Sequence, residues 1–108
     1  MFARILSFDV KLEKKEDLVK ALKNQIVPIL KKQNGFLEIL PFFPEKMREE
    51  KVCTISLWAT PSDAERYERE IYVRVHDILK PFLTSPIDVK NYHLETTVCE
   101  RFVETLAA

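Results

Sequence analysis

Apolar and polar residues alternate with a period of two along several stretches of the chain, a pattern typical of strands whose two faces differ. The first stretch is Phe2 to Leu12, and a second runs from Val52 to Trp58. A third strand is predicted to begin at Phe36, and a last one covers Val89 to Cys99. In the second stretch one face holds Cys53, Ile55 and Leu57, and the other holds Val52, Thr54, Ser56 and Trp58.

Between these strands the apolar residues recur every three or four positions, which is the period of a helix. The first helical segment starts at Asp17, and Asn34-Gly35 supplies the left-handed residue that ends it. Its apolar stripe is Leu18, Leu22, Ile26, Ile29 and Leu30. Pro28 falls inside this pattern, so we expect it to remove one helical hydrogen bond and to bend the last turn.

The second helix has the clearest start in the chain. Thr60 can cap the free amides, Pro61 suits the first turn, and Asp63 adds a negative charge near the positive end of the helix dipole. The positions that follow form one apolar stripe, which predicts a helix packed against a sheet: Ala64, Tyr67, Ile71, Val75, Ile78 and Phe82.

The resulting order is strand, helix, strand, strand, helix, strand, which is the split βαβ pattern of a ferredoxin-like α+β fold, βαββαβ. Right-handed crossovers place both helices on one face of a four-stranded antiparallel sheet. With 108 residues and 46% apolar content, the chain is long enough for one domain, residues 1–108, and too short for two.

The sheet face turned away from the helices is predicted to be too apolar to stay in water and too polar for an ordinary core. We assign to it Ile5, Ser7, Thr54, Ser56, Trp58 and His93. A second copy of the chain, packed sheet to sheet, would bury this face and leave a small cavity between or beside the sheets. The sequence therefore predicts a homodimer of the dimeric α+β barrel type.

Composition narrows the classes of function. Lys plus Arg and Asp plus Glu are equal at 17 each, so no overall field attracts nucleic acid or an anionic membrane. No apolar run is long enough to span a bilayer, and we expect a cytoplasmic protein. The one glycine, Gly35, rules out phosphate-cradling loops and dinucleotide fingerprints. Cys53 and Cys99 lack metal-type spacing, which favours small strand residues over a disulfide or a reactive thiol.

Four short motifs in a fixed order carry a family resemblance. They are Val27-Pro28-Ile29-Leu30, Lys32-Gln33-Asn34-Gly35-Phe36-Leu37, Ile55-Ser56-Leu57-Trp58 and Leu79-Lys80-Pro81-Phe82-Leu83. The chain resembles the antibiotic biosynthesis monooxygenase family of dimeric α+β barrels, roughly from Ile5 to Val98. Each motif alone is weak, while their order and spacing are moderately specific for the fold and poorly specific for activity.

The resemblance implies two kinds of chemistry. Some members oxygenate aromatic polyketides or quinols without metal or flavin, and others bind and degrade haem. The haem-degrading branch uses a first-strand asparagine, a second tryptophan and a histidine about ten residues later. Here Leu6 or Ser7 stands at the asparagine position and Tyr67 at that of the tryptophan, while His76 follows nine residues after Tyr67. The resemblance thus does not favour haem degradation, although a haem or porphyrin pocket stays open.

Several side chains are candidates for chemistry. His76 and His93 can act as general bases, because an unperturbed imidazole titrates near neutral pH, and His76 is also a possible iron ligand. The substrate-binding candidates are Trp58, Ser56, Tyr67, Tyr72 and Asn91, with Ser56 or Asn91 holding a developing oxyanion. For each there is a structural alternative: a solvated histidine, or an aromatic ring that fills the core or an interface. Arg4 is expected to pair with a carboxylate.

Two hypotheses of different classes follow. In the first, the homodimer is a cofactor-independent monooxygenase that acts on a small aromatic or quinol-type substrate in an apolar pocket. Such an enzyme needs chiefly a dry pocket and one base, so it leaves almost no motif. In the second, the dimer is a non-catalytic module that binds a small ligand, with haem as one option, or that mediates an interaction.

Overall fold

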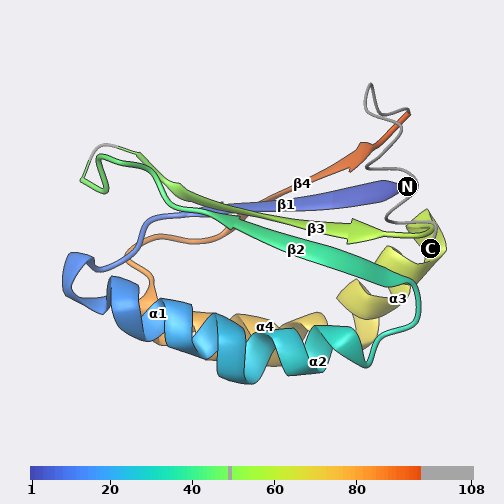
Figure 1. Ribbon diagram of the computed structural model, residues 1–108, viewed down its shortest axis with the longest axis horizontal. Helices are drawn as coiled ribbons and strands as arrows, with labels where there is room; N and C mark the ends of the chain where they lie inside the picture. Colours follow the sequence, from blue (N-terminus) through green and yellow to red (C-terminus); the bar gives the residue numbers. More distant parts are fainter. Residues whose placement is uncertain (49, 96–108) are drawn as a thin grey trace.

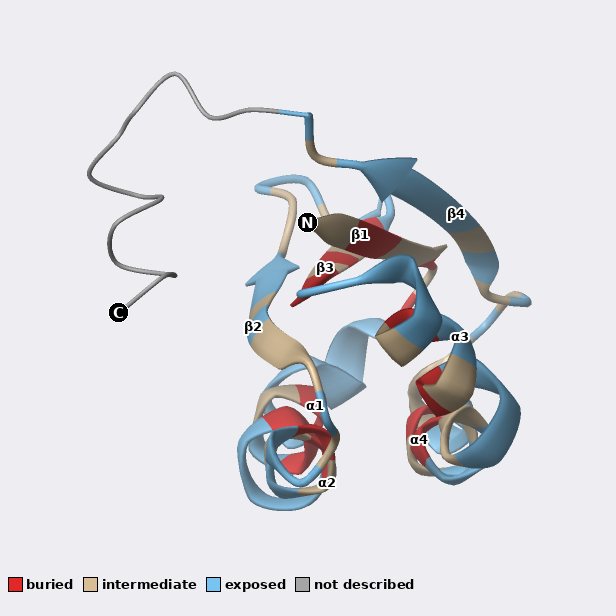
Figure 2. Ribbon diagram, turned by 90° about the vertical axis from the view of Figure 1, so that its right-hand side faces the viewer, coloured by how far each residue is buried: buried red, intermediate tan, exposed pale blue. Residues whose placement is uncertain are grey.

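The computed structural model describes residues 1–48 and 50–95, which form a layer of helices under a single sheet (Figure 1). The sheet has four antiparallel strands in the order β2-β3-β1-β4. Their bounds are Phe2–Phe8 for β1, Phe36–Phe42 for β2, Val52–Trp58 for β3 and Asp88–His93 for β4. All helices cover the same face of this sheet (Figure 2). The predicted ferredoxin-like α+β fold is therefore confirmed.

The first helical segment is interrupted by a π-helical turn. The 3-10 turn η1 (Leu12–Lys14) leads into α1 (Lys15–Ala21), the π turn η2 (Leu22–Ile26) follows, and α2 (Val27–Lys31) ends the segment. Pro28 therefore lies in the first turn of α2. Pro28 has no amide hydrogen to donate to a carbonyl four residues earlier, and the helix widens directly before it, where the Val27 amide donates to the Leu22 carbonyl. The wide π turn thus replaces the bend that we expected at the end of the helix.

The second helical segment starts as predicted and then divides. Thr60 caps α3 (Pro61–Glu70), because its hydroxyl accepts a hydrogen bond of 3.1 Å from the Asp63 amide. Ile71, with φ of −122°, separates α3 from α4 (Tyr72–Leu79), and the 3-10 turn η3 (Lys80–Phe82) completes the segment. The predicted apolar stripe is therefore shared between two helices with different axes.

The register of β1 and β3 decides which side chains face the helices. The antiparallel pairs are Phe2 with Trp58, Arg4 with Ser56, Leu6 with Thr54 and Phe8 with Val52. Paired residues point to the same face, and Phe8, Val52 and Trp58 belong to the buried core. Our assignment of Thr54, Ser56 and Trp58 to the opposite face is therefore wrong. Val52 and Trp58 are buried against the helices, and side chains alternate along a strand, so Thr54 and Ser56 point to the helices as well.

The strand β4 carries His93, which we assigned to the face turned away from the helices. This strand pairs with β1, and the partner of His93 is Phe2. His93 is exposed, packs edge-on against the ring of Phe2 with centroids 5.4 Å apart, and also lines a hollow on the sheet face turned away from the helices. The predicted continuation of this strand to Cys99 lies outside the described residues.

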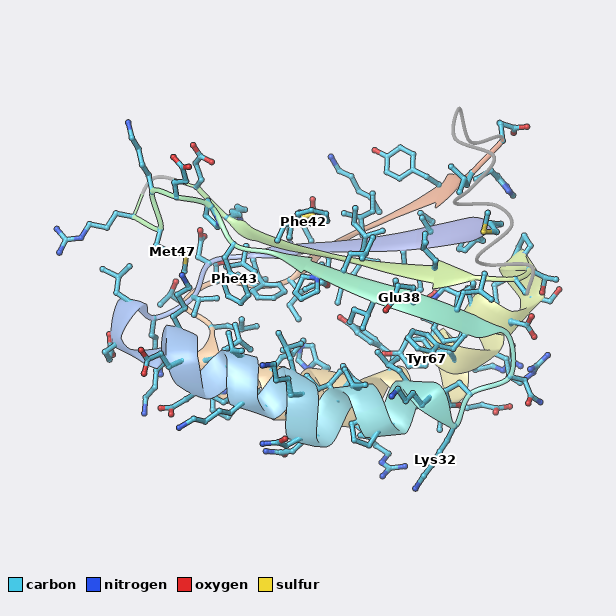
Figure 3. All side chains as sticks on the ribbon, in the orientation of Figure 1. Lys32, Glu38, Phe42, Phe43, Met47 and Tyr67 are labelled. Atoms are coloured by element: carbon cyan, nitrogen blue, oxygen red, sulfur yellow. The ribbon has the colours of Figure 1, made fainter. Side chains whose placement is uncertain are left out.

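The face turned away from the helices, here called the outer face, is apolar at its centre. Its central side chains are Ala3, Ile5, Leu40, Ile55, Leu57 and Tyr92. At the end of β2, Phe42 points to this side, whereas Phe43 points toward the helices (Figure 3). Among the described residues, no helix is long and apolar enough to cross a membrane.

Candidate functional site

A small cavity lies between the sheet and the two helical segments. The helix–sheet cavity is lined by Arg4, Leu6, Leu22, Ile26, Leu30, Ile39, Thr54, Ser56, Tyr67, Val75 and Leu79. Its volume is about 20 Å³, which leaves room for one group the size of a water molecule. The cavity is apolar except where Arg4, Thr54, Ser56 and Tyr67 reach it.

A series of aromatic rings passes this cavity. It starts at Phe36 on β2 and continues through Trp58, Tyr67, Tyr72 and His76. Neighbouring ring centroids are 5.5, 4.8, 6.1 and 6.1 Å apart in that order, within the range of favourable aromatic pairs. Tyr67 lies between the sheet and the helices (Figure 3). The series joins the edge strand to the exposed side of α4.

Ser56 lines the cavity from β3, and Trp58 is hydrogen-bonded to it. Both side chains are buried, and the indole Nε1–H of Trp58 donates a 3.0 Å hydrogen bond to Ser56 Oγ. This bond satisfies the one polar group of the tryptophan, which can then remain in the core. Ser56 Oγ keeps its own proton available for a second partner in the cavity, since a hydroxyl both accepts and donates.

Arg4 is a functional candidate that sequence reasoning took for a structural residue only. Its side chain is 2% exposed, and its guanidinium carbon lies 4.9 Å from the ring centre of Tyr72 and 5.6 Å from that of Tyr67. Arg4 Nη1 is 3.1 Å from Glu68 Oε2, so the expected carboxylate partner is present. The cavity wall therefore includes a buried cation, the Arg4 guanidinium, that stacks on two aromatic rings.

Burial sets the ionisation of the two tyrosines. It raises the pKa of the Tyr67 hydroxyl, an effect that the positive charge of Arg4 opposes in part. Burial likewise raises the pKa of Tyr72, with Arg4 lowering it and Glu68 raising it. Both hydroxyls are therefore neutral at physiological pH and can donate hydrogen bonds.

A wider groove runs along the edge of the sheet between α1, the π turn, α2 and β2. The β2 groove is lined by Val19, Leu22, Lys23, Val27, Lys31, Phe36, Leu37, Glu38, Ile39, Pro41 and Phe43. Its volume is about 540 Å³, within the range of small-molecule pockets, about 300–1,000 Å³. Leu22 and Ile39 belong to both the groove and the helix–sheet cavity, so these two apolar side chains separate the two spaces.

The structure brings together some of the predicted site residues and leaves others apart. Ser56 and Tyr67 line the helix–sheet cavity, Trp58 contacts both of them, and Tyr72 contacts Tyr67, so all four lie between the sheet and the helices instead of on the outer face. The remaining candidates are His76, His93 and Asn91.

These three are at the periphery. His76 is part-exposed, next to Tyr72, with Nδ1 4.0 Å from Asp77 Oδ1. His93 packs on Phe2, and Asn91 is exposed opposite Arg4 on the edge strand β4. Among residues 1–48 and 50–95, no group of three or more His, Cys, Asp or Glu side chains could hold a metal ion.

The fold recurs in proteins of known structure. The haem degrader MhuD from Mycobacterium tuberculosis, solved with two haems in its active site, superposes with a TM-score of 0.74 at 15% identity, over 92% of this chain and 100% of that one. For the cofactor-independent oxygenase SnoaB from Streptomyces nogalater, solved as a mutant, the TM-score is 0.68 at 13% identity, over 90% of this chain and 95% of the other.

A third similar structure is a proposed antibiotic biosynthesis monooxygenase from Nitrosomonas europaea, with a TM-score of 0.68 at 17% identity over 89% of this chain and 100% of that chain. No protein-family model and no curated protein sequence matches the chain. At these identities the likeness establishes a shared fold, whereas substrate and reaction have to be argued from the residues of this chain.

Proposed function

We propose, on the premise that the chain has the fold of antibiotic biosynthesis monooxygenase-type proteins, that it is a cofactor-independent monooxygenase for a small aromatic substrate of the quinol or anthrone type. The observation that carries this proposal is the aromatic series from Phe36 to His76, because it runs from the β2 groove past the buried cavity. In the β2 groove, the rings of Phe36 and Phe43 offer such a substrate stacking partners.

The β2 groove is the space in which the body of the substrate fits. It has about 540 Å³ and mostly apolar walls, whereas the cavity of about 20 Å³ accepts only one polar group of the substrate. Leu22 and Ile39 must rotate to connect the two spaces. Leu22 is the first residue of the π turn η2. Such turns are frequent at functional sites, where the helix is less regular and more easily rearranged.

The reaction that we propose needs no reductant. Loss of a proton converts the reactive methylene of an anthrone into an anion, which transfers an electron to O₂. After recombination, one oxygen atom remains on the carbon as a carbonyl, and the other leaves as water with the two methylene hydrogens. The protein has to exclude bulk water, hold the substrate anion and accept the proton.

His76 is the better of the two candidate bases. Its ring ends the aromatic series 6.1 Å from the ring of Tyr72, and its side chain is partly exposed, so a proton that it accepts can pass on to solvent. His93 packs against Phe2 at the end of β4 and is not part of the aromatic series. His76 lines neither the β2 groove nor the helix–sheet cavity, so we propose that the substrate proton reaches it through the neighbouring Tyr72 hydroxyl or a water molecule, and that His93 has no catalytic role.

Binding of haem is the alternative, and one observation favours it. The apolar β2 groove has Lys23 and Lys31 in its lining, and these cations could meet the acidic groups of a porphyrin. Among the described residues, however, the lining of the groove and of the helix–sheet cavity includes no histidine or cysteine, and burial raises the pKa of its one tyrosine, Tyr67, so that its hydroxyl stays neutral. Because these side chains do not fit an iron ligand set, we assign no step to haem.

The quaternary structure that we propose is a homodimer through the outer face. A hollow of about 310 Å³ is lined there by Ala3, Ile5, Leu40, Ile55, Leu57, Tyr92, His93 and Leu94. Around this apolar centre stand Glu38, Asp88 and Lys90, which are exposed or half-exposed polar residues at the rim. An apolar centre with a polar rim is the usual anatomy of a protein interface.

Oxygen uptake tests the proposed reaction. Hydroquinones and anthrones are incubated with the protein in an oxygen electrode, and products are identified by mass spectrometry. We expect uptake with at least one anthrone, and a rate about 10²–10⁴-fold lower for His76→Ala, the usual effect of removing a general base. The matched variant His93→Ala should retain the rate. Absence of uptake with every substrate would favour the non-catalytic module, and a rate that is equal in wild type and His76→Ala would remove our base.

A further inference from the structure

Among the described residues, the two buried Nη donors of Arg4 make no hydrogen bond, although Glu68 forms an ion pair with one of them. The Arg4 side chain is 2% exposed, and neither Nη1 nor Nη2 makes a hydrogen bond to any of the described residues. Glu68 Oε2 lies 3.1 Å from Nη1, but this contact lacks hydrogen-bond geometry, and the Glu68 side chain is 49% exposed. Because a buried charge is costly unless it is paired and hydrogen-bonded, Glu68 compensates Arg4 only in part.

The surroundings of Arg4 hold the guanidinium in place and leave its donors available. The rings of Tyr67 and Tyr72 flank it, and the residues that line the helix–sheet cavity with it include no carboxylate. The Tyr72 hydroxyl is likewise buried without a hydrogen-bond partner among the described residues. Arg4 and Tyr72 are therefore neighbours whose side chains both have hydrogen-bond donors without an acceptor among the described residues. An anionic oxygen is the partner that would accept from both.

We propose that Arg4 and Tyr72 are the anion-binding groups of this site, and that its ligand is an aromatic molecule with an anionic oxygen on or next to the ring. The inference rests on the proposed function, since it takes the same site for an aromatic ligand and adds the charge of that ligand. The cavity beside Arg4 has the size of one oxygen group, about 20 Å³. An ionised phenol or enol has this form, and Arg4 would stabilise the same anion that precedes reaction with O₂.

Glu68 is the natural competitor of such a ligand. Its carboxylate occupies the position nearest to Nη1, and as a half-exposed residue of α3 it can turn into solvent when another anion arrives. A neutral side chain at position 68 should therefore strengthen binding of the anion. A purely structural Arg4–Glu68 ion pair predicts the opposite, namely a less stable protein without any gain in affinity.

Three small probes with the same nitrophenyl ring test the charge of the ligand. 4-Nitrophenol can ionise at oxygen, 4-nitrobenzoate carries a carboxylate, and 4-nitroanisole is the neutral ether. We expect the phenolate to bind about tenfold more tightly than either the neutral phenol or the ether, so that the pKa of bound 4-nitrophenol falls by about one pH unit, which its yellow absorption band reports. Tighter binding of the benzoate than of the phenolate would also support an anion site and would assign it to carboxylates.

Two variants connect this selectivity to named residues. Glu68→Gln should raise the affinity for the phenolate about two- to fivefold and leave that for 4-nitroanisole unchanged. Arg4→Met should abolish the preference for the anions, with folding checked by far-UV circular dichroism. Should Arg4→Met not fold, the Glu68→Gln titration decides alone, because residue 68 is exposed.

The outcomes separate this inference from the proposed function. Equal affinities of the wild type for 4-nitrophenolate and 4-nitroanisole, or no gain in Glu68→Gln, would overturn the anion site and leave an aromatic site in place. If none of the three probes binds, the aromatic site fails, and the inference fails with it.

Discussion

At the scale of single residues, the candidate site combines side chains that sequence could suggest with one whose role it could not. Ser56, Trp58, Tyr67 and Tyr72 were selected by residue type and spacing; Ser56 and Tyr67 line one cavity, and Trp58 and Tyr72 pack against Tyr67. The role of Arg4 depends on an unsatisfied hydrogen-bonding capacity, which only three-dimensional contacts reveal. The available signal was a single charge among the apolar residues of one strand face.

Tyr72 offers a test of stability against function. Its hydroxyl is buried without a partner among the described residues, and such a group costs about 1 kcal/mol. Tyr72→Phe removes the hydroxyl and keeps the shape of the ring, so it should raise the free energy of unfolding by about that amount. The same change should weaken binding of 4-nitrophenolate. Urea unfolding measures the first effect. A loss of stability in Tyr72→Phe would show that the hydroxyl has a partner.

The raised pKa of Tyr67 predicts how stability depends on alkaline pH. Burial is the main cause of the shift, and the folded state holds the hydroxyl proton more tightly than the unfolded state does. The resulting stabilisation is complete below about pH 10, the ordinary pKa of tyrosine, and it decreases as the pH rises further. Urea unfolding between pH 8 and pH 11 should show this decline. Tyr67→Phe should reduce the slope, and an unchanged slope would contradict the assignment.

At the scale of the elements, the irregular positions are the ones that shape the site. Tyr67 and Tyr72 are five residues apart, which on one continuous helix would separate their directions by about 140°. The break at Ile71 allows both rings to contact Arg4, at 5.6 and 4.9 Å. Apolar periodicity predicted the stripe correctly, but it cannot distinguish one helix from two with a change of axis. The π turn before Pro28 escaped sequence reasoning for the same reason.

Gly35 connects α2, β2 and the start of α3, and it should not tolerate a side chain. Its φ is +81°, and a Cβ built on it would collide with the side chain of Asp63. Its carbonyl also accepts a 2.8 Å hydrogen bond from the Ala59 amide. Gly35→Ala should therefore lower the free energy of unfolding by more than the 1–2 kcal/mol or so that a left-handed backbone alone costs.

Urea unfolding of Gly35→Ala, compared with Asn34→Ala at the exposed neighbouring position, measures this effect. The double variant Gly35→Ala with Asp63→Ala should recover only part of the loss, because Asp63 Cβ itself also lies too close. Full stability in Gly35→Ala would mean that the connection between α2 and β2 is not as described.

At the scale of the whole molecule, the order of the elements was sufficient to predict the fold. It was not sufficient to predict which face of β3 points to the helices. Both faces of β3 carry apolar residues, so alternation alone left two choices. Val52 and Trp58 pack against the helices, so Ser56, which is on the same face of β3, lies in the interior. The expected hollow between two subunits and the polar site residues therefore belong to opposite sides of the sheet.

The outer face leads to a prediction about the oligomeric state of the protein. Ile55 is central there, between Ile5 and Leu40, so Ile55→Asp would place a charge in the middle of the proposed dimer interface. We expect wild type to be a dimer and Ile55→Asp a monomer in size-exclusion chromatography with light scattering at micromolar concentration. Val73→Asp, at a 65% exposed position of α4, serves as the control of equal type. A monomeric wild type would contradict the interface.

The central claim is that the aromatic ligand binds between the sheet and the helices, beside Arg4, and not on the outer face. Nuclear magnetic resonance tests it most directly, because Trp58 is the single tryptophan of the chain and its indole signal needs no assignment. On titration with 4-nitrophenol, the account predicts that the Trp58 Nε1–H and Arg4 Nε–H resonances shift together while the ring signals of Tyr92 remain in place. Shifts at Tyr92, with Trp58 and Arg4 unaffected, would contradict it.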